Sequence, residues 1–317
     1  MIDTNIVDRT TVEGNRFDPA RARGRGTTDL VRSFRTAAAL GWKMEANWTD
    51  PLLFFIYSVA KPVASALILV FMLQVIAGPS GIALRPFVIV GSALWSFVVS
   101  GVAGLAWAVL DDRERYRMLK YIYVSPSSFL TILIGRGVAR LAVGAMGAGI
   151  TLAVGVVVLG VPFEPLAVNW PLLVIVLVMG VVTISALALV MAAICLQTRQ
   201  ESWDYPEVVV GALFLVVGAV FPLSVLPLPL QVFGLISPLT WWIAGVRQAL
   251  FPGGPSSIGG PGSLWQQLSG QLNPSAVQVV IALLVSGAIV TLASAILFRA
   301  GEARAKDRGL IDRTTGS

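Results

Sequence analysis

The densest group of reactive side chains lies in residues 111–127, whose sequence is DDRERYRMLKYIYVSPS. Acidic and basic residues alternate at its start, and a Ser-Pro pair closes it. On a short helix the apolar side chains would share one face; these are Met118, Leu119, Ile122 and Tyr123. The basic side chains would lie on the other faces; these are Arg113, Arg117 and Lys120. A solvated loop needs no apolar face, whereas a helix that docks into a partner's groove does. The segment is therefore predicted to be a cytosolic helix that contacts another protein.

A second pattern places small residues at every fourth position of the apolar segment 86–110. This small-residue stripe consists of Ser92, Ser96, Ser100, Gly104 and Ala108. Residues at this spacing share one helical face and let another helix approach closely. The hydroxyl groups could instead form a polar line along a conduit. Close helix packing is the favoured interpretation, and the conduit remains the alternative.

Several kinds of chemistry are excluded because the residues for them are missing. The chain has no histidine and a single cysteine, Cys195, so imidazole catalysis, histidine metal sites and an internal disulfide are ruled out. It also lacks the G-x-x-x-x-G-K-[ST], dinucleotide-binding and H-E-x-x-H motifs. No carboxylate falls in the middle of an apolar segment, where an ion-coupled carrier usually keeps one. We therefore expect no metal or cofactor in this chain and an energy source outside it.

Composition and charge placement indicate a membrane protein. Of the 317 residues, 56% are hydrophobic and 13% charged, whereas a soluble domain has about 25% charged residues. Of the 23 basic residues, 17 gather in three places, with 8 in 1–53, 4 in 111–127 and 5 in 299–317. Basic ends and loops between uncharged segments set the orientation of a membrane protein and do not resemble a nucleic-acid groove. Membrane lipids are therefore expected partners, and nucleic acid is not.

The predicted fold is an all-α membrane protein with six transmembrane helices. One crossing takes roughly 20 apolar residues. The six candidate segments are 54–77, 86–110, 129–159, 170–196, 208–223 and 276–298. Within the third segment, residues 141–159 are uncharged. A seventh span over 223–251 would contain prolines and Arg247 and would send the basic C-terminal tail outside. We therefore expect two short re-entrant helices on the outer side, with their turn near Gly234 and Pro238, and both termini in the cytosol.

The remaining segments follow from this layout. Residues 1–26 are predicted to be a disordered cytosolic tail, 27–50 an interfacial helix along the membrane surface, and 51–298 the six-span domain. An outer region covers 223–275, and 299–317 form a basic cytosolic tail. Three cations near the inner ends of spans, Lys61, Arg136 and Arg140, are expected to snorkel to water. A role along a substrate path is the alternative, and Arg136 and Arg140, four residues apart, could bind anionic lipid headgroups.

Three motifs in the same order and spacing resemble a permease subunit of the ABC type-2 exporter membrane family, over roughly residues 30 to 300. The first is Glu114-Arg115, then Leu119 and Ser125-Pro126; the second is Gly218 to Phe221-Pro222, then Leu226-Pro227; the third is Ser237-Pro238-Leu239-Thr240 with Arg247 behind it. This chain departs from the family at Arg117, Met118 and Lys120, where Gly-Thr and an acid are usual, and at Val217, where a serine is frequent. The basic replacements suggest a partner with a more acidic groove.

The resemblance implies a dimer of permeases, with identical or different copies, above two ATP-hydrolysing subunits that carry ATP and Mg. The inner loop would be a coupling helix for the ATPase, through Arg113, Glu114, Arg115, Met118, Leu119, Ser125 and Pro126. The second and fifth spans would line the substrate path, with Ser92, Ser96, Ser100, Phe214 and Phe221 as candidates. The re-entrant motif would comprise Pro222, Pro227, Pro238, Thr240 and Arg247. A bacterial-type plasma membrane is the implied location.

The predicted function is export of a drug-like or lipid-like amphipathic substrate. A polysaccharide or lipid-linked glycan is the second choice, because the spans are aliphatic and offer few aromatic rings for stacking on sugars. A non-transporting membrane scaffold and a lipid-modifying enzyme with Ser or Lys chemistry are the rival classes. The missing histidines and intramembrane carboxylates disfavour the enzyme.

Overall fold

The computed structural model describes residues 27–46, 51–125, 128–198 and 204–309, and every regular element in these ranges is helical. The predicted tail 1–26, Pro126 and residues 310–317 lie outside the described residues. In chain order the α-helices are α1 (Thr27–Ala46), α2 (Pro51–Ala77), α3 (Arg85–Leu110), α4 (Leu119–Val124), α5 (Phe129–Val157), α6 (Trp170–Gln197), α7 (Tyr205–Val216), α8 (Leu228–Ile236), α9 (Pro238–Leu250), α10 (Leu264–Ser269) and α11 (Ala276–Asp307). Short turns η2 (Gly78–Leu84), η3 (Asp111–Arg115) and η4 (Leu223–Val225) lie between them.

Three of the long helices, α5, α6 and α11, start at residues whose side chains cap them. The side chains of Ser128 and Asn169 accept hydrogen bonds from the first turns of α5 and α6. Ser275 and Gln278 form a capping box at the start of α11. Such caps satisfy backbone N–H groups that have no partner within the helix. The apolar runs between the caps remain helical because a helix pairs all its backbone groups internally, as an apolar environment demands.

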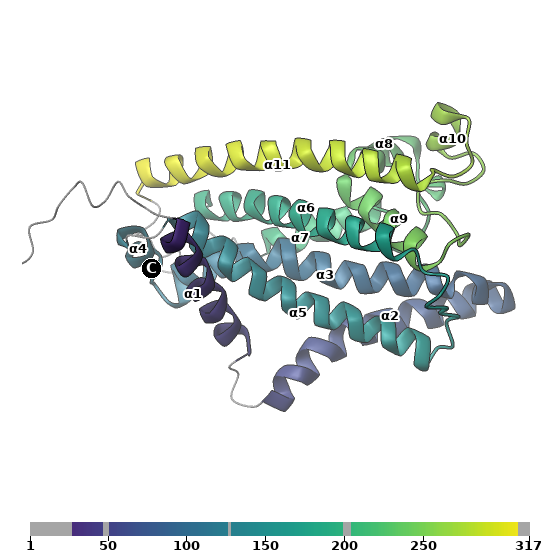
Figure 1. The fold of residues 1–317 in the computed structure, drawn as a ribbon, viewed down its shortest axis with the longest axis horizontal. Helices are drawn as coiled ribbons and strands as arrows, with labels where there is room; N and C mark the ends of the chain where they lie inside the picture. Colours follow the sequence, from purple (N-terminus) through teal and green to yellow (C-terminus); the bar gives the residue numbers. More distant parts are fainter. Residues whose placement is uncertain (1–26, 47–50, 126–127, 199–203, 310–317) are drawn as a thin grey trace, which may run out of the picture.

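The long helices run side by side along the longest axis of the molecule, and α1 lies obliquely across one end (Figure 1). Helix α3 is the most enclosed of them: 83% of its most apolar stretch is buried, against 22–39% for α5, α6 and α11. Helices α2, α5, α6, α7 and α9 pack against α3, and the outer faces of the bundle expose aliphatic side chains. This is the distribution expected of a bundle whose surroundings are themselves apolar.

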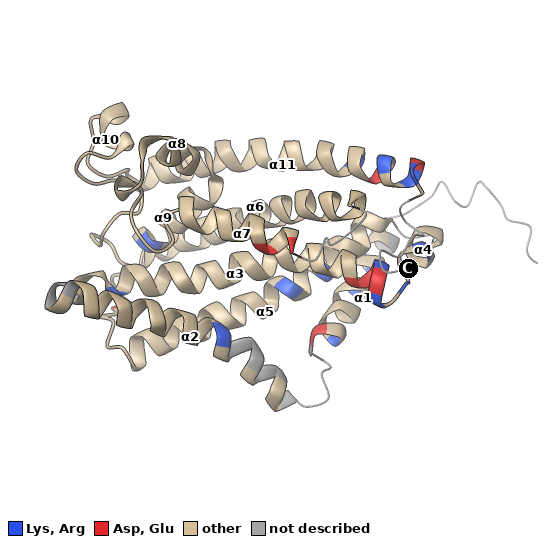
Figure 2. Ribbon diagram, turned by 180° about the vertical axis from the view of Figure 1, so that it is seen from behind, with Lys and Arg blue, Asp and Glu red and all other residues tan. Residues whose placement is uncertain are grey.

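Charged residues gather at the end of the bundle that carries α1, α4 and the C-terminal end of α11 (Figure 2). We call this the inner end, because the sequence predicts that it faces the cytosol. The opposite, outer end carries α8, α9 and α10 (Figure 1). Helix α11 continues to Asp307, so the first residues of the predicted basic tail are helical, and Ala305 is still buried against the bundle.

Four described helices are long and apolar enough to cross a membrane, and the number rises to five if α8 and α9, bent by 79°, count as one broken span. The prediction of a multi-pass helical protein is confirmed, whereas six spans are not. The described apolar part of α2 and all of α7 fall below this length. Helix α7 has 12 residues, about 18 Å, against about 30 Å of hydrocarbon.

The predicted fifth span over 208–223 was wrong at its outer end. Helix α7 ends at Val216, and Gly218 has a φ of +72°, a left-handed conformation that terminates a helix. The chain then leaves the helix axis before Phe221. The following residues form η4 and the two short helices, which meet at Ser237, just before Pro238.

Candidate functional site

The inner end of α3 finishes in a π-helical turn, η3, and not in a regular helix. The N–H of Tyr116 donates to the carbonyl of Asp111 at 2.8 Å, and that of Met118 to the carbonyl of Asp112 at 2.9 Å. Arg117 then adopts a φ of +50°, which is rare for a residue with a side chain. Single π turns are frequent at functional sites. This turn reverses the chain and delivers α4 to the inner end of the bundle.

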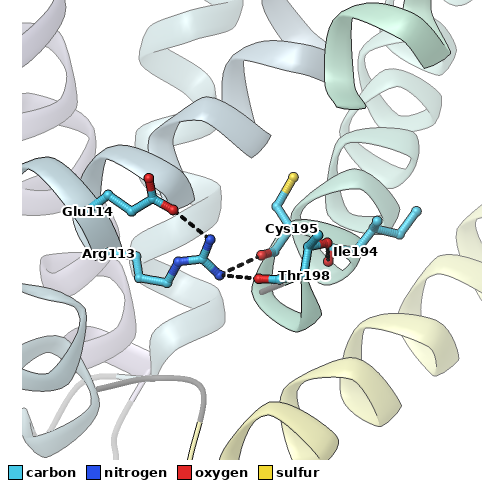
Figure 3. A network of polar contacts seen from close by, with 5 residues as sticks. All are labelled: Arg113, Glu114, Ile194, Cys195 and Thr198. Carbon is cyan, nitrogen blue, oxygen red and sulfur yellow. Dashed lines mark hydrogen bonds and ion pairs between the residues drawn. The ribbon is translucent and has the colours of Figure 1, made fainter. Parts of the chain in front are cut away.

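Arg113 connects this turn to the end of α6. Its side chain is buried, and one nitrogen, Nη1, donates to the carbonyls of Cys195 at 2.9 Å and Thr198 at 3.0 Å. The other, Nη2, pairs with Glu114 Oε1 at 2.8 Å (Figure 3). The last carbonyls of a helix lack partners within it, and a cation there also opposes the negative end of the helix dipole. Arg113 therefore closes α6, which differs from the surface role that the sequence predicted.

Three further ion pairs lie beside the turn. Arg136 of α5 is buried and pairs with Asp112, and Arg140 pairs with Glu45 of α1 at 2.6 Å and lies 3.6 Å from Asp111. Arg136 is buried with an acidic partner, so the prediction that it snorkels to water was wrong. Arg140 keeps about a fifth of its side chain exposed (22%), and binding of lipid headgroups stays a prediction. Burial raises the pKa of the Glu45 carboxyl, and the cations of Arg140 and Arg136 act against that rise.

Helix α4 turns its apolar face inward. Leu119 is 1% exposed, and Ile122 and Tyr123 pack against the same cluster at the inner ends of α5, α6 and α11. The ring of Tyr123 stacks on Phe129 with 4.6 Å between centroids, and burial raises the pKa of its phenol. The expectation that Leu119, Ile122 and Tyr123 face a partner is therefore corrected, because these side chains pack into a groove of the bundle itself.

The opposite face of the turn and α4 is open. It comprises Arg115, Arg117, Met118, Lys120, Tyr121 and Val124, all of them exposed. We call these residues the inner docking surface. Ser125 ends α4 by donating its hydroxyl to the carbonyl of Ile122 at 2.8 Å. Of the predicted coupling residues, Arg115 and Met118 are thus accessible, Glu114 is half-buried, and Arg113 and Leu119 are inside.

A cavity of about 440 Å³ opens between α2, α3, α5 and α7. Four of the five predicted path residues line it: Ser92, Ser96, Ser100 and Phe214. Phe221 is not among the lining residues, because α7 ends before it. Three aromatic residues line the cavity: Trp95, Trp107 and Phe214. The ring centroids of Trp95 and Phe214 lie 4.9 Å apart.

The small-residue stripe packs closely against a neighbouring helix and also lines the cavity, while its role along a conduit stays a prediction. A Cβ atom on Gly144 would lie 2.6 Å from that of Ser100, so α3 and α5 pack closely there. Ser92 and Ser96 line the cavity and donate their hydroxyl hydrogens to carbonyls of their own helix, those of Val88 and Ala93, at 2.9 and 2.8 Å. Their oxygens therefore offer lone pairs as acceptors. The charged lining residues, Lys61, Arg140, Glu45 and Glu207, come from the inner parts of their helices.

The predicted re-entrant motif surrounds a buried arginine at the outer end. Pro222 and Pro227 precede η4 and α8, and Pro238 opens α9. Nη1 of Arg247 donates a hydrogen bond to the carbonyl of Gly218 at 2.7 Å, and Nη2 donates one to the carbonyl of Phe87 at 2.9 Å. Nη2 also bonds the carbonyl of Ala219. Thr240 is fully buried in the same helix. Arg247 thus joins α9, the turn after α7 and the start of α3.

Sequence reasoning missed the acidic partners Asp112 and Glu45 and the small residue Gly91. The doublet Asp111-Asp112 at the end of one apolar segment, with two arginines four residues apart in the next, is a signal that could have predicted the pairs. Gly91 carried no signal. A Cβ atom there would lie 1.7 Å from the carbonyl oxygen of Ala219, so its importance depends on a contact between distant segments.

Comparison with known proteins agrees with this architecture. A search of curated proteins finds no matching relative. The profile of the ABC-2 type transporter family matches residues 36–251, which is more than half of the chain. The matched region contains the π turn, the inner docking surface, the cavity and the buried arginine. The chain therefore belongs to the ABC-2 type transporter family and is a multi-pass membrane permease of that family.

Proposed function

We propose that the chain is the membrane subunit of an ATP-driven exporter, powered by a separate ATPase that holds ATP and Mg. The observation that carries this proposal is the 440 Å³ cavity, lined by Ser92, Ser96, Ser100 and Phe214. Its volume lies within the range of sites for drug-sized ligands, about 300–1,000 Å³. Aromatic rings beside hydroxyl oxygens, with charges toward the inner end, suit an amphipathic drug-like or lipid-like substrate. Export from the cytosol follows from the family resemblance.

The assembly we propose has two permease copies, identical or different, in a bacterial-type plasma membrane. Both termini lie in the cytosol. The ATPase docks on the inner docking surface, where three basic side chains surround exposed Met118, Tyr121 and Val124. A partner groove with acidic residues around an apolar floor complements this surface. A movement of the docked π turn would then be coupled to α6 through Arg113. This residue belongs to the turn, and its side chain bonds the carbonyls at the end of α6.

Reversing one charge on the inner docking surface should weaken the assembly. We expect Arg117→Glu to lower the amount of ATPase that co-purifies in mild detergent roughly ten-fold, equivalent to about 1.4 kcal/mol. Arg304→Glu, an equally exposed reversal on α11 at the same end, is the matched control and should co-purify normally. Mass spectrometry of the wild-type sample identifies the partner by its phosphate-binding motif. Recovery of the permease alone, repeated after crosslinking, would favour the scaffold and refute the exporter.

Filling the cavity should block transport without unfolding the protein. Ser96 is half-buried at the cavity wall, so the indole of Ser96→Trp can occupy the free space. We expect transport to fall at least ten-fold while thermal stability and ATPase co-purification stay at the wild-type level. Ser185→Trp, on α6 and outside the cavity lining, serves as the control. Normal transport by Ser96→Trp would exclude this cavity from the substrate path.

A further inference from the structure

A second, smaller cavity lies at the outer end, between the start of α3, α9 and the loops on either side of α10. Its volume is about 150 Å³, and its polar lining comes from Arg247, Gln248, Ser256, Ser257 and Asn273, with Phe87 on one wall. None of these residues belongs to the substrate cavity. The small cavity is therefore a separate feature, and its function is not explained by transport.

The charge of Arg247 has no counter-ion among the described residues. The side chain is 5% exposed, its carbonyl partners are neutral, and its guanidinium carbon lies 3.6 Å from the centroid of the Phe87 ring. No ion pair involves it in the described part of the chain, and its Nε has no hydrogen-bond partner there. A buried charge without an ionic partner is expensive. Carbonyl dipoles and an aromatic face offset only part of that cost.

Two other polar atoms at this cavity also lack partners among the described residues. The hydroxyl of Ser257, in a residue that is 1% exposed, makes no hydrogen bond there, and neither does the amide oxygen of Gln248. The two residues lie on different segments and meet only at the cavity. Several unsatisfied buried groups around one space usually mark an ion or ordered water. The combination of an unpaired cation and a free hydroxyl donor at one cavity favours an anion.

We propose that this cavity binds a small monovalent anion, of the size of chloride or formate, as the counter-ion of Arg247. The hydroxyl of Ser257 can donate to the anion, and a water between the anion and Gln248 can donate to both. The volume suffices for such an ion with a few waters, since each water takes about 30 Å³ in the liquid. Because Arg247 holds α3, α9 and the turn after α7 together, the anion stabilises the outer end of the bundle.

The test is the thermal stability of the purified full-length chain in dodecyl maltoside at constant ionic strength. Sodium gluconate, whose anion is much larger than chloride or formate, is replaced stepwise by sodium chloride or sodium formate. We expect a saturable rise in Tm of several degrees with either small anion. The assay needs no ATPase and no substrate, so a negative result does not bear on the proposed transport function. Equally, a failure of the transport proposal would leave the anion site open to this test.

Variants locate the effect in the cavity. Ser257→Ala is expected to fold and to weaken the apparent anion affinity roughly ten-fold, because it removes a direct donor worth about 1.4 kcal/mol. Arg247→Gln should abolish the anion dependence if it folds. Arg85→Gln, which removes a cation outside the cavity lining, should keep the wild-type response. The proposal is overturned if wild-type Tm is the same in gluconate, chloride and formate, which would leave water alone in the cavity. A response unchanged in Ser257→Ala would also overturn it.

Discussion

Arg113→Met should both destabilise the permease and disconnect ATP hydrolysis from transport. The substitution removes the donors to the carbonyls of Cys195 and Thr198 and the partner of Glu114 (Figure 3). Each buried acceptor left without a partner costs about 1–3 kcal/mol. We therefore expect the free energy of unfolding to fall by about 2–5 kcal/mol. Methionine keeps most of the aliphatic volume, so the loss reports on the hydrogen bonds and the charge.

The functional effect of Arg113→Met follows from the same contacts. Without them, a docked ATPase can move the π turn while α6 stays in place. We expect the ATPase to co-purify normally but its hydrolysis to lose the stimulation by substrate. Arg304→Met is the matched control, because Arg304 is exposed on α11 at the same end and lies outside the inner docking surface; surface changes of this kind stay within about 0.5 kcal/mol. Equal unfolding curves and equal coupling for the two variants would disprove this role of Arg113.

The parts of the site that could be predicted from sequence depend on local periodicity. Residues four apart share a helical face, so the spacing alone places Ser92, Ser96 and Ser100 together. Proline and glycine also predicted the break at the outer end, because Pro238 cannot continue a preceding helix. These inferences need only the geometry of one helix. Phe221 was misplaced because the left-handed Gly218 ended α7 earlier than its apolar run suggested.

The parts that could not be predicted depend on contacts between distant residues. The π turn inserts an extra residue into the helical repeat. The buried face of α4 therefore cannot be predicted by continuing the periodicity of α3 through the turn. Leu119 is buried and adjacent Met118 exposed, although both are apolar. The burial of Arg136 depends on Asp112, which is 24 positions away in sequence. A charged residue near a span end is therefore ambiguous until its partner is known.

Gly91→Ala should be among the most damaging single-methyl changes in the molecule. A Cβ atom at this position would lie 1.7 Å from the carbonyl oxygen of Ala219 and 2.2 Å from Nη2 of Arg247. Neither neighbour can yield independently, because that nitrogen bonds the carbonyls of both Ala219 and Phe87. Helix α3 is enclosed by the other helices, so it cannot shift outward either. Overpacking of a rigid interior costs about 1–3 kcal/mol and occasionally more, and we expect about 3 kcal/mol here.

Gly149→Ala on α5 is the matched control, since a Cβ atom there meets nothing within 4 Å. Alanine is a better helix former than glycine by about 1 kcal/mol, so this control should unfold at the wild-type temperature or slightly above it. The comparison therefore isolates the contact at the outer end from the change of residue type. Gly91→Ala should also lose the rise in Tm with chloride, because it displaces the arginine that the anion neutralises. If Gly91→Ala matched Gly149→Ala in stability, Arg247 could not be the rigid junction between α3, α9 and the turn after α7.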